Sequence, residues 1–220
     1  MQNEIHVIVG RKGSGKTELA KTLINSVEFG NIIWYDTIGE FAQGKSGLPG
    51  FEKIKSLKVL RNRLLGWQNK AYRLIGGGYP SFEIVYLPGK YRATVDLAYT
   101  WSFLEARYKL TKQPATIVVD ESDLFNRGGQ PDKTIKDMVM RGRHAALDQF
   151  YITQRPIGLT QQVMSQADFW WLFQMDLPSD LDFLKKIIPA SVVDELPNLP
   201  IGTGIFYDRK VKEIKKIQSR

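Results

Sequence analysis

Residues 10–17 read Gly10-Arg11-Lys12-Gly13-Ser14-Gly15-Lys16-Thr17, and this octapeptide sets the architecture that we expect for the whole chain. It follows an apolar run at 5–9 and precedes a helical pattern over 16–28. A strand, a glycine-rich loop and a helix, in that order, form a phosphate-binding P-loop. The glycines let backbone N–H groups turn toward phosphate oxygens, and the positive end of the helix dipole faces the same anion. We therefore expect residues 10–17 to bind the phosphates of a nucleotide.

Two side chains that end this loop have defined chemical roles. Lys16 is spaced to reach the β- and γ-phosphates, and Thr17 is spaced to place its hydroxyl on Mg²⁺. The expected ligands are ATP, as the substrate, and Mg²⁺, as the cofactor. The alternative is an ordinary glycine loop at a helix start, which the flanking strand and helix disfavour.

Composition limits the classes of protein to consider. With 220 residues, 43% of them hydrophobic and 25% charged, the chain has the size and composition of one globular domain. The absence of cysteine and the presence of only two histidines exclude disulfides and make a structural zinc site very unfavourable. No apolar run approaches the roughly 18 residues of a membrane span, and no signal peptide is visible at the start.

The formal net charge of +8 indicates a polyanionic partner. Basic residues concentrate in two stretches, 45–73 and 209–220. A basic surface that only keeps the protein in solution is the alternative interpretation. The stretch at 45–73 is equally suited to face DNA or another protein.

Apolar runs and helical patterns alternate along the chain, which predicts an α/β fold with a mostly parallel sheet and helices on both faces. Strands are expected at 4–9, 32–35, 82–87, 116–119, 149–153, 169–173 and 204–207. Helices are expected at 16–28, 94–110 (with Thr94 as its N-cap), 132–146, 161–165 and 179–188. One domain over 1–208 results, with an irregular basic insertion at about 42–80 and a basic tail at 209–220. Short β-like pieces at 57–60 and 72–75 predict a small hairpin within the insertion.

A second nucleotide motif follows the strand at 116–119. An apolar strand that ends in an aspartate is the Walker B pattern, so Asp120 is expected to hold Mg²⁺ opposite Thr17. The adjacent Glu121 is placed to polarise a water for attack on the γ-phosphate, which favours hydrolysis over phosphoryl transfer to a substrate. The alternative is a solvated acidic turn.

Two further polar groups flank the next strand. Gln154 ends the strand at 149–153, and in a parallel sheet that position lies near the γ-phosphate. Arg141 and Arg143 precede the same strand, and a guanidinium matches phosphate bidentately. We expect one of them, with Arg143 slightly favoured, to act as an arginine finger on a neighbouring subunit. Ordinary surface arginines are the alternative.

The strand at 82–87 lies between the P-loop and the Walker B strand in sequence, and with Glu121 it resembles the RecA-like, additional-strand division of P-loop proteins. Specific motifs narrow the resemblance to the FtsK/HerA superfamily of DNA-pumping ATPases. They are Gly142-Arg143-His144 before Thr153-Gln154-Arg155-Pro156, Asp36-x-x-Gly39-Glu40-Phe41, Ala167-Asp168, Leu196-Pro197 and Gly202-Thr203-Gly204. The match covers most of the chain except about 42–80. Taken as an ATPase domain alone, the chain is similar to the small genome-packaging ATPases of viruses.

The resemblance implies an ATPase, driven by ATP hydrolysis and coupled to DNA, that forms a homo-oligomeric ring of six or five subunits. It implies double-stranded DNA as the partner, a capsid portal or vertex protein as a second one, and a location in the host cytoplasm or the virion. It also implies a sensor glutamine at Gln154 and a trans-acting arginine at Arg141 or Arg143. Arg127 and Lys133, in or beside a glycine-rich loop, are candidate DNA contacts. The alternatives are an ATPase for DNA transfer or for phage assembly and secretion, and a nucleotide switch without translocation.

Overall fold

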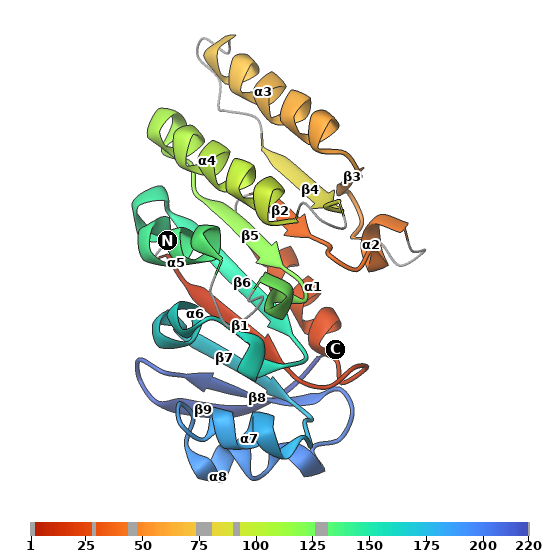
Figure 1. Cartoon of the computed structure of the whole chain (residues 1–220), viewed down its shortest axis with the longest axis vertical. Helices are drawn as coiled ribbons and strands as arrows, with labels where there is room; N and C mark the ends of the chain where they lie inside the picture. The colour runs from red at the N-terminus through yellow and green to blue at the C-terminus, as the bar shows by residue number, and fades with distance from the viewer. Residues whose placement is uncertain are drawn as a thin grey trace.

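The computed structural model describes residues 3–27, 30–43, 48–73, 81–89, 93–125 and 132–219. These residues form one nine-stranded sheet with the strand order β3-β4-β2-β5-β6-β1-β7-β8-β9 (Figure 1). The strands are β1 (Ile5–Val9), β2 (Asn31–Tyr35), β3 (Glu52–Ile54), β4 (Phe82–Tyr86), β5 (Ala115–Val119), β6 (Leu147–Thr153), β7 (Phe169–Phe173), β8 (Thr203–Asp208) and β9 (Glu213–Gln218).

Seven strands, from β3 to β7 in sheet order, run parallel, and β8 and β9 continue the sheet antiparallel. The helices are α1 (Lys16–Asn25), α2 (Glu40–Gln43), α3 (Leu57–Arg73), α4 (Ala93–Thr111), α5 (Lys133–Arg141), α6 (Gln161–Gln166), α7 (Pro178–Leu184) and α8 (Ala190–Val193). Two short 3₁₀ helices are η1 (Ser122–Phe125), which follows Glu121, and η3 (Gly142–Ala145), which follows α5.

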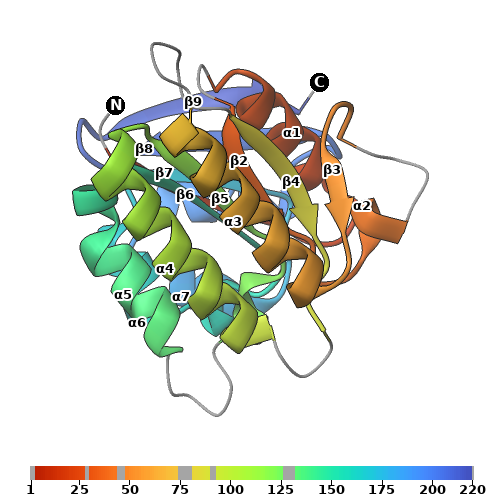
Figure 2. The same ribbon diagram turned by 90° about the horizontal axis from the view of Figure 1, so that it is seen from above.

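Alternate side chains of the buried strands enter two separate cores, as the period of two in a strand requires. The larger core packs the side chains of strand positions such as Val7, Ile33 and Ile117 against α3, α4, α5, α6 and α7. The smaller core packs Ile8, Trp34 and Val118 against α1 and the start of α2. Figure 2 shows α3 to α6 on one side of the sheet and α1 on the other. The predicted α/β fold, a mostly parallel sheet covered on both faces, is confirmed.

The strand that separates the P-loop strand from the Walker B strand in the sheet is not the strand at 82–87 that lies between them in sequence. It is β6, which pairs with β1 on one side and with β5 on the other. The predicted strand at 82–87 is β4, which pairs with β2 and β3 near the sheet edge. Sequence order and sheet order differ here, because the position of a parallel strand is set by its crossover connection. The additional-strand architecture is present, but a different strand provides it.

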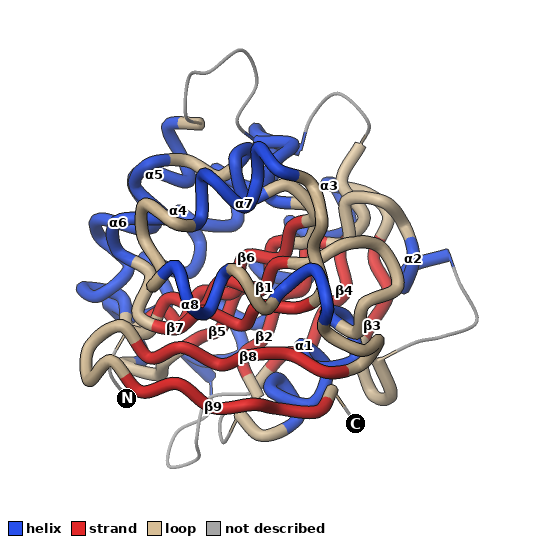
Figure 3. Tube along the Cα trace, turned by 90° about the horizontal axis from the view of Figure 1, so that it is seen from below, coloured by secondary structure: helices blue, strands red, loops and turns tan. Residues whose placement is uncertain are grey.

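Three local predictions also differ from the structure. Residues 57–60 do not form a β piece, because they begin α3, which buries Leu60 and Leu64 and leaves Lys58, Arg61 and Arg63 exposed. Thr94 lies inside α4 rather than at its N-cap. Within the stretch predicted as a tail, residues 213–218 form β9, which pairs along β8 at the sheet edge (Figure 3).

Candidate nucleotide-binding and catalytic site

Three predicted motifs follow three adjacent strands. The P-loop follows β1, Asp120 follows β5, and Gln154 follows β6, which lies between them. Register pairs Val9 with Thr153 and Val119 with Tyr151, so all three motifs start at the same carboxyl edge of the sheet. In parallel α/β sheets this edge is where ligands bind. The topology therefore brings together residues that are up to 144 positions apart, from Gly10 to Gln154.

The P-loop wraps the first turn of α1. Gly13 and Gly15 have φ angles of +74° and +112°, which residues with a side chain rarely adopt. Gly15 is the N-cap residue of α1, so the first N–H groups of the helix face the loop interior. Arg11 and Lys12 are exposed on the loop, and Ser14 is buried beneath it.

Lys16 is buried, and its Nζ donates a hydrogen bond to the backbone oxygen of Arg11 at 3.0 Å. Burial lowers the pKa of Lys16, and nearby carboxylates, Glu121 foremost, oppose that shift. Thr17, the next residue, lines the same pocket. An ammonium held against its own loop is well placed to move onto phosphate oxygens.

Asp120 is 4% exposed and stands where β5 ends. Its Oδ1 accepts the backbone N–H of Glu121 at 3.0 Å. Burial, and next the charge of Glu121, raise the pKa of Asp120 to about 7. A buried carboxylate with a raised pKa is stabilised in its charged form by a cation. Asp120 and the Thr17 hydroxyl thus suit Mg²⁺.

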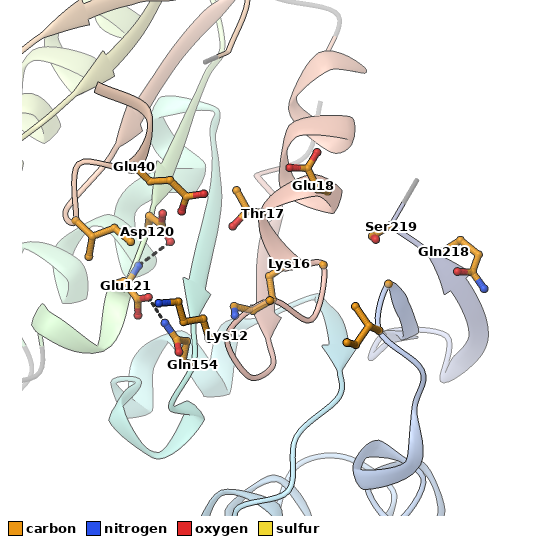
Figure 4. Close-up of a pocket in the computed structure, with 15 residues that line it drawn as sticks. Lys12, Lys16, Thr17, Glu18, Glu40, Asp120, Glu121, Gln154, Gln218 and Ser219 are labelled. Atoms are coloured by element: carbon orange, nitrogen blue, oxygen red, sulfur yellow. Dashed lines mark hydrogen bonds between the residues drawn. The ribbon is translucent and has the colours of Figure 1, made fainter. Parts of the chain in front are cut away.

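Glu121 and Gln154 contact each other directly. Gln154 Nε2 donates to Glu121 Oε1 at 2.5 Å, which links the Walker B turn to the end of β6 (Figure 4). Burial raises the pKa of Glu121, while the hydrogen bond from Gln154 lowers it. A carboxylate with a raised pKa is suited to accept a proton from an attacking water. The amide holds that carboxylate in one orientation.

Together these groups line a pocket of about 730 Å³, a volume in the range of small-ligand sites. Lys12, Lys16, Thr17, Asp120, Glu121 and Gln154 all contribute to it. Among the described residues, no cluster of three His, Cys, Asp or Glu side chains could hold a metal by itself.

Glu40 is a pocket residue that the sequence placed in a motif but not in the site. It opens α2 and lies near Asp120 and Thr17 (Figure 4). Buried Asp36 fixes it there, because its two carboxylate oxygens accept the N–H groups of Glu40 and Phe41, both at 2.9 Å. The spacing Asp36-x-x-x-Glu40 after a strand was the available signal.

Four other residues that line the pocket were not expected from the sequence to be part of the site. They are Ile201, Gly202, Gln218 and Ser219. They come from the turn before β8 and the end of β9, in the stretch predicted as a closing segment and a tail. Only the pairing of β9 with β8 brings residues 218–219 to the P-loop.

The candidate arginine fingers lie away from this pocket. Arg141 ends α5 and forms an ion pair with Glu105, whereas exposed Arg143, in η3, has a 3.4 Å contact from its Nε to His144 Nε2. Gly142 packs near Asn3, which precedes β1, so both arginines lie at the amino edge of the sheet. The seven residues of β6 separate that edge from Gln154 by about 20 Å. Neither arginine can reach the pocket of its own chain.

The two candidate DNA contacts differ in what can be said of them. Lys133 is exposed and is the first residue of α5, whose N-cap is Asp132. Arg127 lies outside the described residues.

Among the described helices, none combines the length and apolar character needed to cross a bilayer.

Comparison with known sequences gives two partial matches, and no family model matches the chain. Over 115 residues, 50% of this chain, it is 21% identical to the DNA double-strand break repair helicase HerA of Pyrococcus furiosus, of which the match spans 21%. Over 101 residues it is 26% identical to the DNA packaging ATPase of Enterobacteria phage PRD1, covering 42% of each protein. The matched part is less than half of either relative.

Comparison with solved structures covers nearly the whole chain. The genome packaging NTPase of Sulfolobus turreted icosahedral virus 2, in complex with AMPPCP, has a TM-score of 0.75 at 21% identity, covering 98% of this chain and 97% of that one. VirB4 of Thermoanaerobacter pseudethanolicus has a TM-score of 0.63 at 12% identity, covering 97% and 88%. The chain has the fold of these P-loop ATPases, and its predicted resemblance to HerA and the viral packaging ATPases is confirmed.

Proposed function

We propose that this chain is an ATP-hydrolysing motor that forms a homo-oligomeric ring and drives double-stranded DNA into a preformed viral capsid. The observation that carries the proposal is the convergence of the P-loop, Asp120–Glu121 and Gln154 in one pocket on three adjacent strands. The packaging NTPases and HerA, which this chain resembles in fold and partly in sequence, support DNA as the moved polymer.

Each group in the pocket has one task in this mechanism. The P-loop amides and Lys16 bind the β- and γ-phosphates, and Thr17 and Asp120 hold Mg²⁺, which neutralises charge that develops on the phosphates. Glu121 accepts a proton from the attacking water. Gln154 contacts Glu121 and the γ-phosphate, so its hydrogen bonds change when the γ-phosphate leaves. β6 transmits this change from the carboxyl to the amino edge of the sheet.

The finger comes from a neighbouring copy, because about 20 Å of sheet separates it from its own pocket. Arg143 is the stronger candidate, since Arg141 is already paired with Glu105. A guanidinium that enters beside the γ-phosphate stabilises the charge of the transition state. Hydrolysis then depends on contact between subunits.

DNA is held through its phosphates, without reading of sequence. Lys133 is proposed as one contact, because it is exposed at the first residue of α5 and carries a positive charge that a DNA phosphate can neutralise. Arg127 is proposed as its companion. A portal or vertex protein of the capsid is the proposed second partner. The proposed location is the host cytoplasm or the virion.

The test is the rate of ATP hydrolysis with and without duplex DNA, at low salt because phosphate contacts weaken steeply as salt rises. We expect duplex DNA to accelerate hydrolysis. A rate that no DNA concentration changes would contradict translocation and leave a nucleotide switch. Light scattering with ATP and duplex DNA measures whether a ring forms, and an ATPase that stays a monomer would contradict the motor.

A further inference from the structure

The nucleotide pocket extends on both sides of the P-loop. On one side are Asp120, Glu121 and Gln154, and on the other are Ile201, Gly202, Gln218 and Ser219. Figure 4 shows Gln218 and Ser219 across the start of α1 from Asp120 and Glu121. In the proposed function the γ-phosphate lies beside Glu121. We call the residues on the opposite side the wall, namely Ile201, Gly202, Gln218 and Ser219. The wall therefore faces the other half of the nucleotide, which is the nucleoside.

This wall is fixed to the P-loop by backbone contacts. Gly202 donates its N–H to the oxygen of Ser14 at 3.0 Å, and Ser219 donates its N–H to the oxygen of Gly202 at 2.8 Å. A Cβ on Gly15 would lie 2.7 Å from Ser219 Oγ. The phosphate loop and the 201–202 and 218–219 segments thus pack as one unit, so a ligand held by one is positioned by the other.

The wall also exposes an apolar side chain that the folded chain does not cover. Ile201 is 70% exposed, the most of any large apolar side chain that the structure describes. Next to it are polar groups, because Gln218 Nε2 donates to Thr203 Oγ1 at 3.2 Å and Ser219 carries a hydroxyl. One apolar surface with a few fixed polar groups is the usual make-up of a small-ligand site.

We propose that Ile201, Gly202, Gln218 and Ser219 bind the nucleoside half of the nucleotide, with the base covering Ile201 and the polar groups facing ribose and base edges. The inference rests on the proposed binding of ATP by the P-loop and adds the part of the ligand that the phosphate motifs do not address. Phosphate binding and nucleoside binding are then separable by mutation.

The experiment measures the dissociation constants of ATP and of inorganic tripolyphosphate, both with Mg²⁺, for the wild type and for Ile201→Ala. Loss of the apolar cover should weaken ATP binding about tenfold, while tripolyphosphate binding stays unchanged. The matched control is Val211→Ala. Val211 is 68% exposed and lies in the β8–β9 turn, outside the pocket, so both constants should keep their wild-type values.

Each result distinguishes the two proposals. If Ile201→Ala leaves ATP binding unchanged in a protein that binds ATP, the nucleoside lies elsewhere and this inference is wrong. If ATP and tripolyphosphate weaken equally, Ile201 acts by supporting the P-loop and not by contacting the nucleoside. If the wild type binds neither ligand, the proposed function itself fails.

Discussion

Glu121 has a backbone conformation that few glutamates adopt. Its φ of +47° is left-handed, which costs a residue with a side chain about 1 kcal/mol. This conformation directs the Glu121 side chain from the end of β5 toward Gln154, and the backbone N–H of Glu121 donates a hydrogen bond to Asp120. The strand pattern of the sequence indicates where Asp120 falls, but no local pattern indicates that the next residue turns left-handed.

Replacing the carboxylate by an amide tests the role of Glu121. In Glu121→Gln the shape and the pocket remain, but the proton acceptor is lost, so ATP should bind with nearly wild-type affinity while turnover falls by a factor of about 100 or more. Nucleotide binding and phosphate release measured on the same preparation check this. Turnover close to that of the wild type would show that another group is the base.

Asp148 gives a prediction about pH that is independent of catalysis. It is buried in β6 and its Oδ1 accepts the N–H of Glu4 at 3.0 Å. Burial raises its pKa from 3.8 to about 6. The folded protein therefore holds this proton more tightly than the unfolded chain does. The contribution of the group to stability is full below pH 3.8 and is lost as the pH rises through about 6.

Asn at this position keeps the oxygen acceptor and carries no charge. Asp148→Asn should therefore raise the free energy of unfolding at about pH 8 by about 1 kcal/mol, and the gain should vanish near pH 4. Urea unfolding of both proteins at the two pH values measures the difference. A difference that does not change with pH would show that the charge of Asp148 is not the cause.

At the scale of the elements, the sequence predicts what local patterns determine. The P-loop, α1, β5 and β7 are found where period and composition place them, because buried strands and helix starts have local signals. The features that local patterns do not predict depend on segments far apart in sequence. Crossover connections place β6 between β1 and β5, and the β8–β9 hairpin brings the end of β9 to the P-loop. Helix α3 was missed because its polar face and glycine resemble loop sequence.

Helix α5 allows an element-scale test. Asp132 caps it, since Oδ1 accepts the N–H of Thr134 at 2.7 Å and of Ile135 at 3.3 Å. Asp132→Ala should lower the free energy of unfolding by about 1 kcal/mol. Asp137→Ala, inside the same helix, removes the same charge without a cap and should change stability by less than about 0.5 kcal/mol. Equal losses in the two variants would contradict the capping role.

At the scale of the molecule, the distance between the arginines and the pocket constrains assembly. A finger from η3 can serve a neighbour only if the amino edge of one sheet faces the carboxyl edge of the next. Such a contact joins two different surfaces, and repeated contacts of this kind close into rings when the rotation permits. The proposed ring is therefore head-to-tail.

Mixing variants tests this arrangement. Lys16→Ala subunits lack phosphate binding, and Arg141→Ala/Arg143→Ala subunits lack the fingers, so each should be inactive alone. A mixture should regain part of the ATPase activity, because an intact finger then meets an intact pocket. The single variants serve as controls, and we expect Arg143→Ala to lose more activity than Arg141→Ala. A mixture that stays inactive would contradict a shared site.

The place of β1 in the sheet has a consequence for how the molecule is made. Residues 5–9 leave the ribosome long before residues 149–153 and 169–172, with which they pair. Pairing across such separations is slow, and domains form as their partners emerge from the N-terminal end onward. β1 must therefore stay unpaired and apolar until residues 149–172 have been synthesised. A chain whose synthesis stops before residue 149 would contain the P-loop sequence but neither β6 nor β7, the two strands that flank β1.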